Sequence, residues 1–262
     1  AGTEEMYWAV NEFGACAGIE VTASHNPINF NGMKIVKSKS HPLHEENDFK
    51  CIQRLAETQA FSAVRLSGKV VDRSTEARQA YVDRVLKFVD INALCPLKIV
   101  VNAGNGAAGP TFDAIVQKLS YKSAPLDFIR INHVPDHTFP NGIPNPLLPE
   151  NHHATAKVVK EVGADFGIAF DGDFDRCFFF DEKGRFIPGE YIVGLLAQHF
   201  LKKEEGARII HDNRVILNTR DIVLKNKGVP VVSKVGHSFL KKKMREHNAV
   251  YGGEISAHHY FR

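Results

Sequence analysis

The sequence predicts an α/β fold with more than one domain. Short runs rich in β-branched and aromatic residues alternate with longer segments of helical apolar spacing, and this alternation is typical of α/β proteins. The chain has 262 residues, of which 44% are hydrophobic and 24% are charged. This length and composition suit one large or two medium globular domains with a real core.

The first 187 residues contain predicted strands that end in polar or glycine-rich loops. The β-rich runs are residues 18–23, 97–102, 126–131, 166–170 and 177–181. Apolar spacing predicts helices over residues 45–57, 75–89, a segment that ends near residue 119, and 153–162. The Pro- and Asn-rich segment 135–149 predicts a packed or functional loop, because long structureless loops are uncommon in compact domains.

The last part of the chain repeats the alternation after Pro188-Gly189, which we interpret as a domain joint. Helices are predicted over residues 190–202, 216–225 and 238–246, and strands over residues 208–211, 229–233 and 249–251. This last cycle has three short predicted strands, so we expect it to be cut off in mid-domain.

The composition excludes several classes of protein. With 33 Lys and Arg against 30 Asp and Glu, the net charge of +3 gives no basis for a nucleic-acid or membrane-surface partner. No apolar run approaches the ~18 residues that a membrane-spanning helix needs. The four cysteines lie far apart without a CxxC pair, which argues against a zinc or thioredoxin-like site. We expect a cytoplasmic protein with buried free thiols.

The first loop that could carry chemistry is Thr-Ala-Ser-His-Asn-Pro, residues 22–27, at the end of a predicted strand. Ser24 is expected to expose its hydroxyl beside the imidazole of His25, and Lys34 follows ten residues later. A hydroxyl that accepts a phosphoryl group needs nearby cations and a proton acceptor, and this segment has both. If the serine and asparagine are considered alone, a simple Ser/Asn turn is the better interpretation. The combination of all six residues favours a phosphoryl-accepting loop instead.

A second loop, residues 171–176, reads Asp-Gly-Asp-Phe-Asp-Arg and follows a hydrophobic strand. Alternate carboxylates in an extended loop converge on one side, so Asp171, Asp173 and Asp175 can bind one hard cation such as Mg²⁺. Glu182 falls at the twelfth position of an EF-hand loop, but Arg176 stands where that loop needs glycine. The EF-hand is therefore excluded, and Arg176 adds a positive charge suited to phosphate.

Residues 104–109, Gly-Asn-Gly-Ala-Ala-Gly, fit the G-x-G-x-x-G pattern between a strand and a helix. This pattern is the best argument for a dinucleotide site and hence for an oxidoreductase. The acidic residue that should end the next strand is missing, because Asp127 lies at its start and Asn132 ends it. We therefore interpret the glycines as a sign of tight packing between strand and helix.

The last loop, residues 252–259, combines a carboxylate, a hydroxyl and two imidazoles on one glycine-opened turn. Glu254, Ser256 and His258 suit recognition of vicinal sugar hydroxyls. The alternative is a polar turn near a chain end, or adventitious metal binding by the His-His pair.

His237 follows Gly236 at a predicted strand-to-helix junction, where an anion could lie on the helix N-terminus. An equally good interpretation makes Ser238 a simple N-cap of that helix.

Three loops together resemble the α-D-phosphohexomutase family, in particular its bacterial phosphomannomutase/phosphoglucomutase branch. They are residues 22–27, residues 171–176, and Gly-Glu-Ile-Ser-Ala-His at 253–258, in this order and at this spacing. The resemblance extends essentially from Gly2 to Arg262. It implies consecutive related α/β domains with mixed sheets between helices. These are residues 1–73 with the phosphoserine loop, 74–187 with the metal-binding loop, and 188–262 with the sugar loop.

The resemblance also implies an activity. The chain would be a phosphomannomutase-type isomerase that interconverts hexose 6-phosphate and hexose 1-phosphate of mannose and/or glucose. Ser24 would be the phosphoserine, which acts through a hexose 1,6-bisphosphate that also serves as activator. One Mg²⁺ would be bound by the phosphorylated Ser24 with Asp171, Asp173 and Asp175, and would neutralise charge on the transferring phosphoryl group.

The other matching residues would line the same cleft. Arg176, His25 and Lys34 would line the phosphoryl-transfer site, with Lys34 a candidate proton shuttle. His258 would be an acid/base on the opposite side of the sugar. The residues that would contact the sugar or its phosphate are His237, Glu254 and Ser256.

Family members have four domains, and the match lacks the start of the first, the end of the third and all of the fourth. We therefore expect a fragment with little or no mutase turnover, because the grip on the non-reacting phosphate is missing. The family suggests a place in nucleotide-sugar supply, and the oligomeric state is not predicted. Two other classes stay open: a non-catalytic module that binds sugar phosphate and Mg²⁺, and an oxidoreductase based on residues 104–109.

Overall fold

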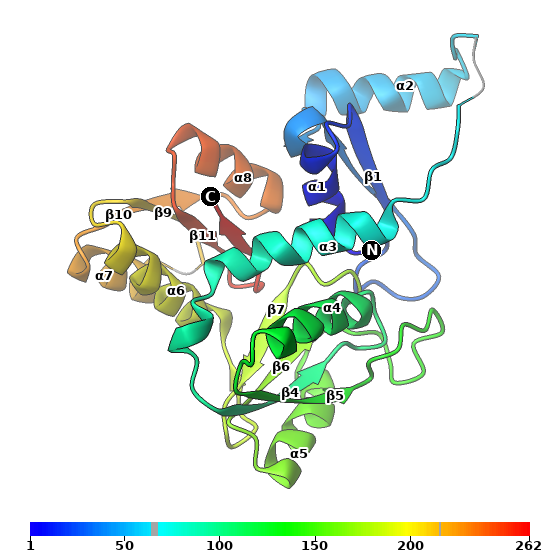
Figure 1. Cartoon of the computed structure of the whole chain (residues 1–262). Coiled ribbons are helices and arrows are strands. Elements are labelled where there is room, and N and C mark those ends of the chain that lie inside the picture. The colour runs from blue at the N-terminus through cyan, green and yellow to red at the C-terminus, as the bar shows by residue number, and fades with distance from the viewer. Residues whose placement is uncertain (64–67, 215) are drawn as a thin grey trace.

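Three β-sheets, each accompanied by helices, organise the chain (Figure 1). This description covers residues 1–63, 68–214 and 216–262 of a computed structural model. Each of the three predicted domains contains one sheet. The second and third sheets have mixed strand directions and lie between helices, which confirms the predicted fold class. The domain limits at residues 73/74 and 187/188 stay predictions.

The N-terminal sheet is antiparallel and has the order β1-β2-β3. Its strands are β1 (Ala17–Val21), β2 (Met33–Lys37) and β3 (His41–Pro42). Helix α1 (Thr3–Glu12) covers one face, where Tyr7 and Val10 pack against Val36. Helix α2 (Lys50–Thr58) follows a π-helical turn, buries none of its residues and projects away from the sheet (Figure 1).

The middle sheet has the order β5-β4-β6-β7-β8. Its strands are the parallel β4 (Leu97–Asn102), β5 (Leu126–Ile131) and β6 (Phe166–Phe170), and the antiparallel β7 (Cys177–Phe180) and β8 (Phe186–Ile187). Side chains of β4 alternate between the faces: Val101 packs with Phe112 of α4 (Ala108–Tyr121), and Val100 packs with Val159 of α5 (His152–Val162). Helix α3 (Ser74–Val85) packs on α4.

The C-terminal sheet has the order β10-β9-β11-β12. Its strands are the parallel β9 (Arg208–Asp212), β10 (Val229–Ser233) and β11 (Tyr251–Gly253), and the antiparallel β12 (His259–Phe261). Ile209 faces α6 (Gly189–Lys203) and α7 (Ile216–Lys225), whereas Ile210 faces α8 (His237–Glu246). Short 3₁₀ turns occupy Ser38–Ser40, Leu86–Phe88, Ile91–Ala93 and Pro149–Asn151.

Some elements differ from the sequence-based expectations. The last cycle has four strands rather than three, because β12 is too short to show an alternating pattern. The short strand β3 escaped prediction for the same reason, and β2 was also not predicted. Helix α1 was missed because its buried face includes the polar residues Thr3 and Glu5, which interrupt the apolar stripe.

The predicted burial of the cysteine thiols is wrong for three of the four residues. Cys177 is half-buried, whereas Cys16, Cys51 and Cys95 are exposed. Cys51 lies on α2, which buries no side chain, and the other two lie in segments that connect elements. None of the helices in the described part of the chain is both long and apolar enough to cross a lipid bilayer.

The glycine pattern at residues 104–109 provides close backbone packing. A Cβ at Gly109 on α4 would lie 2.0 Å from the carbonyl oxygen of His133, just after β5, and Gly106 has a further partner. A Cβ at Gly106 would lie 2.5 Å from the carbonyl oxygen of Gly172, and the Ala107 N–H donates to that oxygen at 2.9 Å. A Cβ at Gly172 would in turn collide with the carbonyl of Ser24. The glycine loop therefore supports the 171–176 loop, which supports the 22–27 loop.

Glu5 links the N-terminal unit to the middle unit. Its side chain is 2% exposed and accepts hydrogen bonds from Thr111 Oγ1 at 2.5 Å, Arg78 Nε at 3.2 Å and the Gly2 N–H at 3.1 Å. Thr111 belongs to α4 and Arg78 to α3. Because a buried carboxylate is stable only when paired, these bonds fix the position of α1 on both helices.

Replacing Glu5 by alanine should lower the free energy of unfolding by about 2 kcal/mol or more, because Arg78 and Thr111 lose a buried acceptor. Urea unfolding followed by circular dichroism measures the change. Glu12→Ala is the matched control, since Glu12 is exposed at the end of the same helix. Equal losses in the two variants would contradict the interpretation.

Candidate active site

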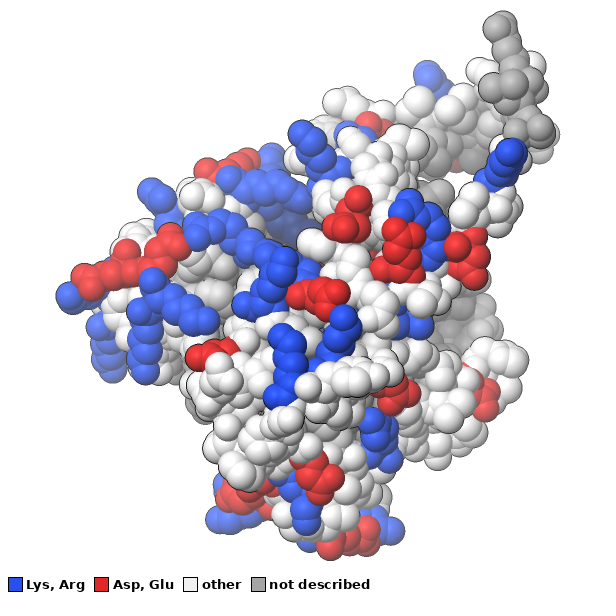
Figure 2. Space-filling view, viewed as in Figure 1, with Lys and Arg blue, Asp and Glu red and all other residues white. Residues whose placement is uncertain are grey.

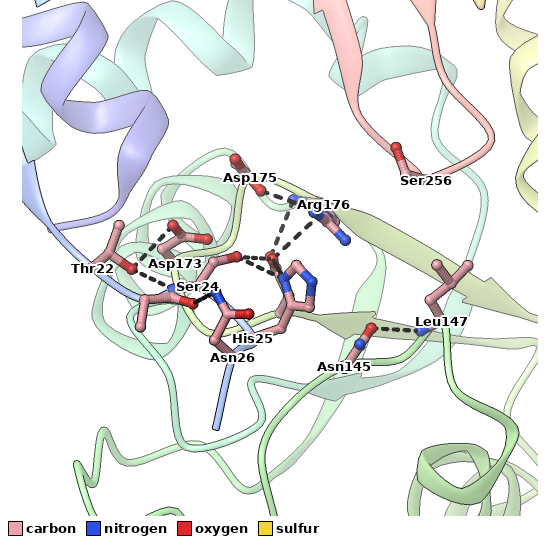
Figure 3. Close-up of polar contacts among 12 residues, drawn as sticks. Thr22, Ser24, His25, Asn26, Asn145, Leu147, Asp173, Asp175, Arg176 and Ser256 are labelled. Atoms are coloured by element: carbon pink, nitrogen blue, oxygen red, sulfur yellow. Dashed lines mark hydrogen bonds and ion pairs between the residues drawn. The ribbon is translucent and has the colours of Figure 1, made fainter. Parts of the chain in front are cut away.

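Ser24 lies where the N-terminal and middle units meet (Figure 3). Its Oγ donates to Asp171 Oδ2 at 3.0 Å and lies 2.9 Å from Nδ1 of His25. The residue has a φ of 56°, which is an uncommon backbone conformation for serine. Such strain is typical of functional loops, and here it places the hydroxyl against a carboxylate and an imidazole.

Two threonines that the sequence analysis did not assign a role hold this arrangement together. Thr22 Oγ1 accepts the Ser24 N–H at 2.8 Å and donates to Asp173 Oδ2 at 3.1 Å. Thr3 at the start of α1 donates to the same oxygen at 3.2 Å. Thr22 belongs to the six-residue motif, so its position gave a signal, whereas nothing in the sequence indicated Thr3.

Asp171, Asp173 and Asp175 form a cluster of carboxylates, as predicted from their alternate spacing. Each offers an oxygen within 4.8 Å of the others, and Asp171 and Asp173 are at most 3% exposed. Burial and repulsion by the other two carboxylates raise the pKa of Asp171 to about 7. Among the described residues, Asp173 Oδ1 has no hydrogen-bond donor although it is buried. Convergent carboxylate oxygens with free lone pairs fit a hard divalent cation.

Three cations surround this cluster. Lys34 Nζ donates to Asp173 Oδ2 at 2.7 Å and to Asp175 Oδ2 at 2.6 Å. Arg176 Nε lies 3.7 Å from Asp171 Oδ2. Burial acts to lower the pKa of Lys34, but Asp175 and Asp173 outweigh it and raise that pKa above its usual value. Lys34 is therefore held in its charged form.

The third cation, His258, connects the cluster to the loop 252–259. Its Nε2 lies 3.3 Å from Asp175 Oδ1, and its Nδ1 lies 3.0 Å from Glu254 Oε2. Burial lowers the pKa of His258, but the contacts with Asp175 and Glu254 raise it to about 9. The ring is therefore protonated at neutral pH. Arg176 Nε lies 3.3 Å from the same Nε2, and its positive charge acts to lower the pKa of His258, but the two carboxylates outweigh it.

Glu254 is 1% exposed, and its carboxylate is fully engaged inside the protein. It accepts from the Gly236 N–H at 3.0 Å and from Tyr260 Oη at 2.7 Å, besides the contact with His258. Burial acts against its ionised form, but these bonds lower the pKa to about 2. In this conformation the bonds of Glu254 hold the 252–259 loop in place. Ser256 is the more accessible of the two predicted sugar contacts.

Asp212 at the end of β9 is a supporting residue that the sequence analysis missed. It is fully buried, and its Oδ2 accepts the Ile255 N–H at 3.1 Å and Arg214 Nη2 at 2.7 Å. Asp212 therefore fixes the 252–259 loop from the neighbouring strand. A lone aspartate at a strand end carries no recognisable pattern, since its partner lies 43 residues away.

His237 is the first residue of α8, and Gly236 is its N-cap. The proposed N-cap role of Ser238 is wrong, because Ser238 lies inside the helix and the N-cap has no side-chain hydrogen bond. Burial, with a smaller effect of Lys241, lowers the pKa of His237 to about 4, so its imidazole is neutral at pH 7. A neutral ring at this position can donate one hydrogen bond to a ligand.

Comparison with known proteins agrees with this arrangement. The phosphoglucomutase/phosphomannomutase family models match residues 1–62 (α/β/α domain I), 79–184 (domain II) and 188–262 (domain III). The three units with their shared site define the α-D-phosphohexomutase class of fold. The chain belongs to the phosphoglucomutase/phosphomannomutase family.

Relatives of known name are similar over the whole of this chain. It is 55% identical over 262 residues to a phosphomannomutase of Salmonella montevideo, and spans 58% of the length of that protein. A phosphoglucomutase/phosphomannomutase family protein from Burkholderia thailandensis superimposes with a TM-score of 0.81 at 31% identity, over 94% of this chain and 51% of the other. A phosphomannomutase-like structure from Thermus thermophilus gives 0.85 at 22% identity, over 100% and 58%, and supports the fold alone.

A hard divalent cation should stabilise the protein through the acidic cluster. At one hundred times its dissociation constant, a ligand that binds only the folded state adds about 2.7 kcal/mol to the free energy of unfolding. Thermal unfolding with and without MgCl₂ measures the effect, and Asp173→Asn should abolish most of it. Asp221→Asn, at an exposed position of α7, should keep it. A response to Mg²⁺ that survives in Asp173→Asn would place the cation elsewhere.

The stability of the metal-free protein should depend on the charge of His258. The folded-state pKa of about 9 exceeds the ordinary 6.5, so the stabilisation is complete below pH 6.5 and is lost as the pH rises through 9. In EDTA, the wild-type protein should lose roughly 3 kcal/mol more across this window than His258→Gln does. Urea unfolding at pH 6.5 and pH 9 measures the difference, and parallel profiles would show that His258 is not charged.

Proposed function

We propose that Ser24 carries a phosphoryl group and that the chain provides the reaction centre of a phosphohexomutase. The reaction would interconvert hexose 6-phosphate and hexose 1-phosphate, of mannose and/or glucose. The observation that supports this most directly is the position of Ser24 Oγ, 3.0 Å from Asp171 Oδ2 and 2.9 Å from His25 Nδ1. A serine on a strained loop beside a cation-binding cluster is suited to phosphoryl transfer.

The proposed reaction has two balanced transfers. First, the bond between phosphorus and Ser24 Oγ breaks while a bond to a sugar hydroxyl oxygen forms, and the hydroxyl proton leaves to a base. The resulting hexose 1,6-bisphosphate then returns its other phosphoryl group to Ser24. Since the serine ends as it began, no further reactant is consumed.

The charges around Ser24 suit separate proton-transfer roles. Lys34 is held protonated, which fits donation of a proton to Ser24 Oγ as the phosphoryl group departs. Burial, with a smaller effect of Arg176, lowers the pKa of His25, so its neutral ring can accept the Ser24 proton in the opposite direction. Protonated His258 and Ser256 lie on the sugar loop, where an acid and a hydroxyl could contact the substrate.

The cation that fits the cluster is Mg²⁺. Asp171, Asp173 and Asp175 would hold it, together with an oxygen of phosphorylated Ser24. When bound, it would supply charge neutralisation at the transferring phosphoryl group. Arg176 would add a fixed positive charge that does not depend on the cation.

A sugar phosphate as substrate agrees with the charge distribution. Residues 188–262 contain 13 Lys and Arg but seven Asp and Glu, so the near balance of the whole chain conceals a positive C-terminal unit. Lys and Arg are visibly concentrated over this unit in Figure 2. Mannose is the first candidate sugar, because the relative from Salmonella montevideo is named a phosphomannomutase. Four free cysteines, three of them exposed, favour a reducing compartment such as the cytoplasm.

The intact mass of the chain tests the proposal. After incubation with glucose 1,6-bisphosphate and Mg²⁺, the wild-type mass should rise by one phosphoryl group, whereas Ser24→Ala should not change. Peptide mass spectrometry should then place the group on Ser24. A folded chain that binds Mg²⁺ and hexose phosphate but never gains mass would instead be a non-catalytic binding module.

A further inference from the structure

A cavity of about 390 Å³ lies behind the loop that carries the carboxylates. Its wall comes from α3, α4, the 170–179 region, α6 and the C-terminal strand, so it lies between the middle and C-terminal units. It shares Asp175 and Arg176 with the candidate active site, but its wall includes neither Ser24 nor Asp171 nor Lys34. It is therefore a separate space at the back of the site.

The wall of this cavity is largely aromatic. Its rings are those of Tyr81, Phe112, Phe170, Phe174, Phe179 and Phe261. Aromatic side chains around an apolar space favour a flat, apolar ligand, and the volume lies within the range of small-molecule pockets.

Two polar groups of the wall have unused hydrogen-bonding capacity. Nε2 of His259 is buried and has no partner among the described residues, while Nδ1 lies 2.8 Å from the Tyr251 hydroxyl. No hydrogen bond joins the Tyr81 hydroxyl to another residue in the described part of the chain. Since a buried polar atom is normally paired, a ligand with a hydroxyl group would complement His259 Nε2, and the same group could also bond to the Tyr81 hydroxyl.

Phe174 connects the cavity to the acidic cluster. It stands between Asp173 and Asp175 and has a φ of 44°, an outlier for a bulky residue. Its ring lies against Gly2, where even a Cβ would collide with that ring. A molecule that displaces this tightly packed ring would act on the strained segment that carries both carboxylates.

We propose that this cavity binds a small planar aromatic molecule that carries a hydroxyl group, and that the bound molecule weakens metal binding at the acidic cluster by displacing Phe174. The second half rests on the metal site proposed above. The first half does not, because the cavity exists in the folded chain independently of a metal.

Fluorescence titration with 2-naphthol in EDTA tests the cavity directly. Binding to the full chain should saturate at one site, and naphthalene should bind about fivefold more weakly because it lacks the hydroxyl. Val85→Phe and Leu196→Phe fill the cavity from two different helices and should each abolish saturation. Val89→Phe is the matched control, since Val89 follows the same helix but does not line the cavity.

Tyr81→Phe then tests the polar contact, and calorimetric titration with Mg²⁺ tests the link. The preference for 2-naphthol over naphthalene should shrink in Tyr81→Phe. Saturating 2-naphthol should raise the dissociation constant of Mg²⁺ at least about fivefold in wild type and leave it unchanged in Val85→Phe.

The outcomes separate the two halves of the proposal. The proposed binding site would be overturned if 2-naphthol did not bind saturably to the wild-type chain. It would also be overturned if Val85→Phe and Leu196→Phe folded and bound 2-naphthol as tightly as wild type. Saturable binding with an unchanged Mg²⁺ affinity would overturn the link through Phe174. If Mg²⁺ itself does not bind, the proposed metal site and the link fail together, while the EDTA titration still decides the cavity.

Discussion

Three clustered carboxylates that repel one another are the constraint on which the arrangement of this protein depends. Asp171, Asp173 and Asp175 can remain ionised together only beside positive charge. That charge arrives from three places: Lys34 on β2, Arg176 on the loop itself, and His258 on the 252–259 loop. Because these groups belong to different sheets, neutralising the cluster requires the three units to assemble around it.

Close backbone contact complements this electrostatic attraction. The 104–109 loop supports Gly172. Because Gly172 has no side chain, the backbone of Ser24 can occupy the space that a Cβ at Gly172 would fill. The pattern that resembles a dinucleotide fingerprint therefore serves a different purpose from phosphate binding by a helix N-terminus. Its glycines allow three loops from two units to stack, which positions the serine hydroxyl against Asp171.

Local patterns predicted most of the fold, but they did not predict which distant groups would meet. Parallel strands such as β4 and β6 are continuous apolar runs, and the alternate spacing of the three aspartates was sufficient to predict a carboxylate cluster. Thr3, Glu5 and Asp212 act on partners 43 to 170 residues away, so no local pattern marks them. The bond from Gly236 to Glu254 likewise exists only once the 252–259 loop packs against the start of α8.

The resting contacts also indicate how the proposed chemistry could be coupled to the charge of the site. Lys34 donates to Asp173 and Asp175, the same residues that would bind a divalent cation. A cation on those carboxylates would take over their neutralisation and weaken their hold on the ammonium group. A phosphoryl group on Ser24, with about −1.5 to −2 charges, would then be the strongest nearby anion for Lys34 and Arg176. The cations that stabilise the folded cluster would thus become the groups that stabilise phosphoryl transfer, without a large movement of the chain.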